Sequence, residues 1–234
     1  MKDLFKYRTK KVLAKVSPQH VVSSRLATKA IRKFADETGL VYFGYVSQRD
    51  DEHKLVRGYT ASRTHIDDNY CLGTIKGYDV TVVARTDAVE LRDRRQTSHW
   101  LIVTFDLHTS RDVPHIYIGN NRHRGMYEAK FPGLIPLSLG VFGQYPQKFE
   151  SSYMVYGRAS NAIEIEQVIS PPLASVVESH FEGASIEIED NTIYLYIETR
   201  YPNETILEKL VSNGLWLAAS IDARLVDQPQ MQTY

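Results

Sequence analysis

Five residues in the middle of the chain have side chains that could bind a metal ion: His99, Asp106, His108, His115 and His123. They fall on or beside neighbouring predicted strands, and imidazoles with a carboxylate from adjacent strands are how β-rich folds assemble metal sites. The spacing argues against such a site, because the chain has no H-x-H or H-E-x-x-H motif. The odd separation of His99 and Asp106 also puts them on opposite faces of a regular strand. A metal-dependent enzyme that uses the 99–123 region is therefore an alternative hypothesis, and ordinary strand-edge histidines are preferred.

Pairs of carboxylates two residues apart could in principle serve acid–base chemistry. The pairs Glu164 with Glu166 and Glu187 with Glu189 have this spacing. The same spacing describes the solvated face of an amphipathic strand, which needs no further assumption. We interpret both pairs as parts of solvated strand faces.

Other motifs of catalysis are missing from the sequence. It contains no Walker pattern, no G-x-G-x-x-G and no G-x-S-x-G elbow. The lone Cys71 has no neighbour in sequence that would lower its pKa, so a buried, inert thiol is expected. We assign no catalytic residue, expect no cofactor and favour a protein that is not an enzyme.

Charge is distributed unevenly along the chain, although the formal net charge is zero. Residues 1–33 hold ten Lys and Arg residues and one acid, whereas residues 160–234 hold twelve acids and three bases. This polarity indicates that the N-terminal end attracts something negative.

The N-terminal arm is predicted to begin with a basic amphipathic helix over residues 2–16. Its predicted anion or membrane contacts are Lys2, Lys6, Arg8, Lys10, Lys11 and Lys15. Such a helix suits anionic lipid headgroups, and the same charge attracts nucleic acid phosphates. Two structural alternatives are that the arm folds back on the acidic C-terminal part, or that its apolar stripe is core. Of these interpretations of the arm, packing on the protein itself is favoured, followed by binding to a membrane surface and then by binding to nucleic acid.

The elements that must position these residues are read from hydrophobic periodicity. A second helix is predicted from Pro18 or Ser23 to residue 38, followed by strands of period two. Ser170 and Asn203 are predicted to cap helices, and Asp190-Asn191 to turn a hairpin between them. The predicted strands cover residues 40–47, 54–61, 78–85, 99–107, 115–118, 126–130, 153–156 and 164–169.

These elements predict an α+β fold, with a mainly antiparallel sheet, two N-terminal helices and a C-terminal helix packed on the sheet. The predicted organisation is a basic helical arm over 1–38, a single domain over 39–226 and a frayed tail over 227–234.

The C-terminal third of the chain has a familiar order of features. Phe149-Glu150, the strand at Tyr153, the helix opened by Ser170-Pro171-Pro172 and the Ile186 hairpin follow one another. Over residues 148–226 this order resembles a bacterial family known as a domain of unknown function, many of whose members carry two membrane-spanning helices. The resemblance rests on apolar patterning and implies no catalytic residue. This chain has a basic amphipathic segment in place of the spanning helices.

The single cysteine predicts a cytoplasmic protein, and the absence of an apolar run of membrane-spanning length predicts that the chain does not cross a bilayer. The basic arm is the feature that predicts association with a membrane surface. The preferred function is a non-enzymatic binding or adaptor domain, peripheral at the inner face of a membrane. Its expected partner is an anionic membrane surface or another protein, with nucleic acid binding through the basic arm as a further alternative.

Overall fold

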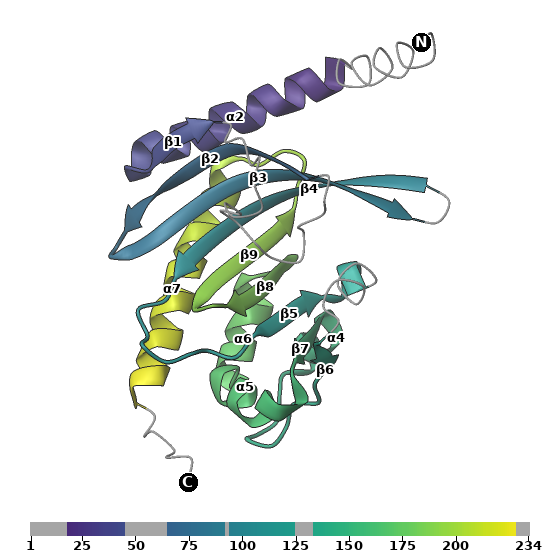
Figure 1. Cartoon of the computed structure of the whole chain (residues 1–234), viewed down its shortest axis with the longest axis vertical. Coiled ribbons are helices and arrows are strands. Elements are labelled where there is room, and N and C mark those ends of the chain that lie inside the picture. The colour runs from purple at the N-terminus through teal and green to yellow at the C-terminus, as the bar shows by residue number, and fades with distance from the viewer. Residues whose placement is uncertain (1–17, 45–64, 92–93, 125–132, 228–234) are drawn as a thin grey trace.

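The computed structural model describes residues 18–44, 65–91, 94–124 and 133–227 of the 234-residue chain (Figure 1). Within these residues nine strands form one sheet in which every strand pairs antiparallel with its neighbours. In sheet order they are β1 (Val41–Gly44), β2 (Ile66–Ile75), β3 (Tyr78–Leu91), β4 (Arg94–Asp106), β9 (Thr192–Glu198), β8 (Ala184–Glu189), β5 (Ile116–Asn120), β7 (Tyr153–Gly157) and β6 (Ile135–Pro136). The α+β fold with a large antiparallel sheet is therefore confirmed.

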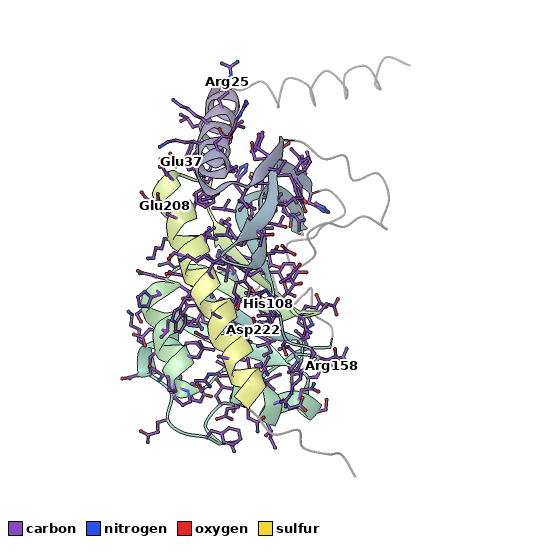
Figure 2. All side chains as sticks on the ribbon, turned by 90° about the vertical axis from the view of Figure 1, so that its left-hand side faces the viewer. Arg25, Glu37, His108, Arg158, Glu208 and Asp222 are labelled. Carbon is purple, nitrogen blue, oxygen red and sulfur yellow. The ribbon has the colours of Figure 1, made fainter. Side chains whose placement is uncertain are left out.

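The described α-helices bury their apolar residues in one core against a single face of the sheet, which we call the helix face. Viewed from the side, α7 runs along this face with α2 above it (Figure 2). The helices are α2 (Pro18–Thr38), α4 (Gln147–Ser152), α5 (Ala162–Val168), α6 (Pro171–His180) and α7 (Glu204–Asp227), with 3-10 turns η2 (Asn121–His123) and η3 (Ala159–Asn161).

Local sequence signals account for the C-terminal elements. The Ser170 hydroxyl accepts a hydrogen bond from the Leu173 amide at 3.5 Å, and the Asn203 side chain accepts one from the Ile206 amide at 2.9 Å. Both contacts satisfy amides that the first turn of a helix leaves unpaired. Asp190 and Asn191, with φ of 50° and 57°, form the turn between β8 and β9, since Asp and Asn tolerate the left-handed region.

The N-terminal prediction is met only in part. Sequence analysis predicts two helices before the sheet, but one, α2, precedes it in the part that the structure describes. The segment of the other, residues 2–16, lies outside that part, as do the predicted strands at 54–61 and 126–130. No helix among the described residues is long and apolar enough to cross a bilayer.

The predicted strand at 164–169 is wrong, because these residues form α5 and its end. The alternation of Glu164 and Glu166 with isoleucines suggested period two. The buried residues Ile165, Val168 and Ile169 instead follow the spacing i, i+3, i+4 of a helix.

Strand β2 was not predicted, and its sequence shows why. The register of its pairing with β3 shifts between Asp68 and Cys71, and Asn69 has a φ of 58°. This bulge interrupts the alternation of apolar and polar residues by which a strand is recognised.

Candidate functional site

The face of the sheet opposite the described helices carries a second layer of buried aromatic side chains, and we call it the aromatic face. Because side chains alternate along each strand, residues of this face come from every second position of the central strands. The rings belong to Tyr70, Trp100, Tyr117, Tyr156, Tyr194 and Tyr196, all at most 8% exposed. The sheet is therefore buried on both faces across its centre.

Charged residues are buried within this aromatic face. Arg85 on β3 makes two hydrogen bonds to Asp67 on β2, at 2.6 and 2.7 Å, and neither side chain is exposed. Such a bidentate pair satisfies the planar guanidinium and the carboxylate together. The positive charge of Arg85 is thus compensated within the fold.

A second group of ionisable residues joins β5 to β8, and we call it the acid–imidazole cluster: His115, Glu187 and Glu189. Nε2 of His115 lies 2.9 Å from Oε1 of Glu187, and Nδ1 lies 3.6 Å from Oε1 of Glu189. The hydroxyl of Tyr196 donates a hydrogen bond to the other oxygen of Glu187 at 2.6 Å. Each of the three residues offers one potential ligand atom, and these three atoms lie within 4.8 Å of one another.

The electrostatics of the cluster follow from its two carboxylates. Burial lowers the pKa of His115. The hydrogen bond to Glu187 and the charges of Glu187 and Glu189 raise this pKa, and together they outweigh the effect of burial. The net pKa is above the ordinary value, because Nε2–H donates to Glu187 and both carboxylate charges favour the imidazolium form. Chemically, the cluster can hold either a proton or a cation.

The other predicted metal ligands lie at separate places. Nδ1 of His99 is 3.2 Å from the hydroxyl of Thr86, beside a cavity of about 140 Å³. Asp106 accepts a hydrogen bond from Thr192 at the end of β4.

The two remaining histidines are also apart from the cluster. The ring of His108 stacks on Tyr78, with centroids 4.3 Å apart. His123 lies over the aromatic face, 3.1 Å from Glu198 and edge-on to Trp100. Of the five predicted candidates, His115 alone belongs to a group of at least three potential ligands among the described residues. The predicted arm contacts Lys2, Lys6, Arg8, Lys10, Lys11 and Lys15 lie outside them.

The spacing of Glu187 and Glu189 predicts a solvated strand face, and this prediction is wrong for Glu187. Glu187 is fully buried, because β8 is an interior strand between β9 and β5. The sequence signal that could have identified Glu187 is a carboxylate inside a strand that has other strands paired on both of its sides. Which strands pair is decided by the order of the sheet.

Glu166 on α5 is another buried carboxylate with a specific partner. Its Oε1 accepts hydrogen bonds from the backbone amides of Gly140 and Phe142, at 2.7 and 3.0 Å. The loop held in this way presents Val141 at 72% and Phe142 at 50% exposure. Ile163, one turn before Glu166, is 57% exposed. We call Val141, Phe142 and Ile163 the apolar tip.

The fold and this arrangement define an α+β protein with a mainly antiparallel sheet that is covered by helices on one face. Among solved structures, the crystal structure of the mycobacterial trehalose monomycolate transport factor A, TtfA, is similar to it. The two chains are 14% identical with a TM-score of 0.57, over 88% of this chain and 98% of that one. This likeness shows a shared fold. Comparison with family models and with curated proteins finds no match.

Proposed function

We propose that this chain is a non-enzymatic binding or adaptor domain that associates with the inner face of a membrane through its basic N-terminal end. The observation that carries the proposal is the exposed face of α2, where Arg25, Lys29 and Arg32 follow one another at the spacing i, i+4, i+7. This spacing places the three bases in one stripe, which we call the basic stripe. Leu26 beside it is 55% exposed.

A surface of this kind suits an anionic bilayer. Each basic residue close to the headgroups contributes about 1 kcal/mol, and an exposed apolar side chain adds a hydrophobic contact. The six bases predicted to make contacts in residues 1–17 precede α2 directly along the chain. They would extend the same contact and make it strong enough for reversible association.

The apolar tip supports a role as an adaptor. It belongs to α5 and to the loop between β6 and α4, at the end of the molecule away from α2 (Figure 1). A domain that rests on a membrane through α2 therefore keeps this tip available for a second macromolecule. Exposed apolar residues that are held in place are typical of interaction sites.

The structural neighbour is compatible with this proposal. TtfA is named as a transport factor. A transport factor of the same fold supports a binding role for this chain. Its name gives no chemical reaction that could be proposed for this chain.

Sedimentation with lipid vesicles tests the proposal. The proteins are the full chain, the chain without residues 1–17, and the variant R25Q/K29Q/R32Q. The control K148Q/R158Q/K209Q removes three exposed bases elsewhere. Arg25 and Arg158 lie far apart along the molecule (Figure 2). Vesicles of neutral lipid and of the same lipid with anionic phosphatidylglycerol are compared.

The full chain and the control should pellet with anionic vesicles and be released by high salt. The truncated chain and the basic-stripe variant should remain largely in the supernatant. Equal pelleting by all four proteins, or none by any, overturns the proposal. Salt-sensitive binding to duplex DNA without binding to vesicles would also overturn it, in favour of the nucleic acid alternative.

A further inference from the structure

The acid–imidazole cluster is built by the pairing of two strands that are distant in sequence. In the ladder between β5 and β8, Ile116 is opposite Ile188 and Tyr117 is opposite Glu187. His115, one residue before β5, therefore stands across from Glu189 and diagonal to Glu187. All three side chains project to the aromatic face, since they alternate with residues of the core.

We propose that His115, Glu187 and Glu189 bind one divalent transition-metal ion of the Zn²⁺ class. An imidazole nitrogen with carboxylate oxygens suits Zn²⁺ and its first-row neighbours, whereas Mg²⁺ and Ca²⁺ prefer oxygen ligands alone. This inference is independent of the proposed membrane role, because the cluster lies on the sheet and away from α2.

The ligand atoms of the cluster are near enough to one another for one ion to draw them together. Zn²⁺ holds nitrogen and oxygen ligands at about 2.0–2.2 Å, which separates tetrahedral ligands by roughly 3.4 Å. The contacts from His115 to Glu187 and Glu189, at 2.9 and 3.6 Å, are made by its two different ring nitrogens, and one ligand atom from each of the three residues lies within 4.8 Å of the others. To bind one ion, the imidazole presents one of its two nitrogens, and the carboxylate that contacts the other nitrogen rotates towards the ion.

One ligand is already oriented by a neighbour. Tyr196 donates to Oε2 of Glu187, which leaves Oε1 directed at His115. Partners of this kind fix the orientation of metal ligands and raise metal affinity. Because Glu187 is fully buried, a cation beside it also compensates a charge that water does not reach.

The other two ligands provide access. The side chains of His115 and Glu189 are 20% and 33% exposed, so an ion can enter from solvent and keep a water ligand. Two carboxylates and a neutral imidazole carry two negative charges, which a divalent ion neutralises. Arg158 is near enough to act on His115 electrostatically, and its positive charge opposes binding in part.

A bound ion would connect two parts of the sheet. β8 and β9 form a hairpin on one side of the site, while β5 and β7 lie on the other. The β5–β8 ladder that joins them has three paired positions. We therefore expect the ion to stabilise the fold, because binding to the native state shifts the unfolding equilibrium.

His123 supplies a matched control. It lies 3.1 Å from Glu198 above the same aromatic face, so it is also a histidine paired with a glutamate. It belongs to no group of three ligands among the described residues. Replacing it removes an imidazole from the same face and leaves the proposed site intact.

The experiment uses the full chain without a histidine tag, stripped of metal, together with the variants H115Q, E189Q and H123Q. Calorimetric titration with ZnCl₂, and with MgCl₂ as a comparison, is combined with thermal unfolding. The wild type and H123Q should bind one Zn²⁺ per chain and unfold at a higher temperature with it. H115Q and E189Q should bind at least tenfold more weakly. Glu187 is left unchanged, because it is fully buried and its replacement would first of all impair folding.

Cobalt gives a measurement that does not depend on any variant. Co²⁺ bound by the wild-type cluster should show the stronger visible absorption of a four- or five-coordinate ion, rather than the weak spectrum of hydrated Co²⁺. The proposal is overturned if the wild type binds no Zn²⁺, if all four proteins bind it equally, or if cobalt retains its hydrated spectrum.

Discussion

The backbone of Gly214 in α7 lies directly against the ring of Phe105 in β4. A Cβ atom at position 214 would stand 2.2 Å from Cε2 of that ring and 3.0 Å from the side chain of Leu195. Glycine inside a helix normally costs about 1 kcal/mol relative to alanine. Here it allows the helix to approach the centre of the sheet.

The variant G214A should therefore destabilise the protein, although it improves helix propensity. Overpacking a filled core typically costs about 1–3 kcal/mol, which exceeds the gain in propensity. Urea unfolding measures the difference. G133A is the control, because a Cβ at Gly133 meets nothing within 4 Å. An increase in stability for G214A would contradict the packing described for α7.

The ion pair of Asp67 and Arg85 should be intolerant of single replacements. Both side chains are fully buried, so D67A removes the carboxylate that accepts two hydrogen bonds from the buried guanidinium. Breaking a buried pair in this way costs about 3–5 kcal/mol. The double variant D67L/R85M removes both charges and should recover part of the loss. Chemical denaturation of the two variants measures this, and a double variant less stable than D67A would show that the pair itself stabilises the fold.

Much of the C-terminal part of the fold was predictable, because its signals are local. Ser170, Asn203 and the Asp190-Asn191 turn act on backbone groups within a few residues, and each was identified correctly. The wide apolar stripe of α7 likewise needs only helical periodicity. Such features require no knowledge of which strands pair.

The acid–imidazole cluster was not predictable in the same way. His115 was among the candidates, but its partners Glu187 and Glu189 are more than seventy residues away in the chain. Their proximity depends on β5 pairing with β8, across a connection whose described part holds β6, β7 and several helices. Local alternation predicts one solvated face, whereas an interior strand in a sheet buried on both sides has none.

Glu166 should control the conformation of the apolar tip. Replacing it with leucine removes the acceptor for the amides of Gly140 and Phe142, at an expected cost of about 1.5–3 kcal/mol for hydrogen bonds to a charged group. The loop should then be cut faster by chymotrypsin after Phe142. The exposed neighbour Glu164 provides the control E164L, which should leave the cleavage rate unchanged. Equal rates for both variants would mean that the carboxylate does not hold the loop.

The thiol of Cys71 should be unreactive in the native protein. Burial, and to a smaller extent the charge of Asp36, raises the pKa of Cys71 to about 12. At pH 8 only about 10⁻⁴ of the thiol would then be ionised, and the thiolate is the reactive form. Labelling with 5,5′-dithiobis(2-nitrobenzoic acid) should be negligible until denaturant is added. Rapid stoichiometric labelling of the folded chain would contradict this.

The contact between Tyr78 and Asp222 should make stability depend on alkaline pH. Tyr78 donates to Oδ2 of Asp222 at 2.8 Å, and the same carboxylate accepts the backbone amides of His108 and Thr109, so α7 is joined to β3 and to the segment after β4. His108 and Asp222 lie side by side in Figure 2. Partial burial, the hydrogen bond to Asp222 and its charge raise the pKa of Tyr78 to about 12.

The direction of the effect follows from linkage. The unfolded chain loses the tyrosine proton near pH 10, whereas the folded chain keeps it to about pH 12, so the contribution is complete below pH 10 and is lost between the two values. Y78F cannot ionise, and its free energy of unfolding should fall less steeply than that of the wild type from pH 10 to 12. Urea unfolding at pH 8, 10 and 11 measures both slopes. Y201F, at an exposed tyrosine, is the control for removing a phenol. If the free energy of unfolding falls in parallel for Y78F and the wild type, the pKa of Tyr78 is not raised by folding and the prediction is wrong.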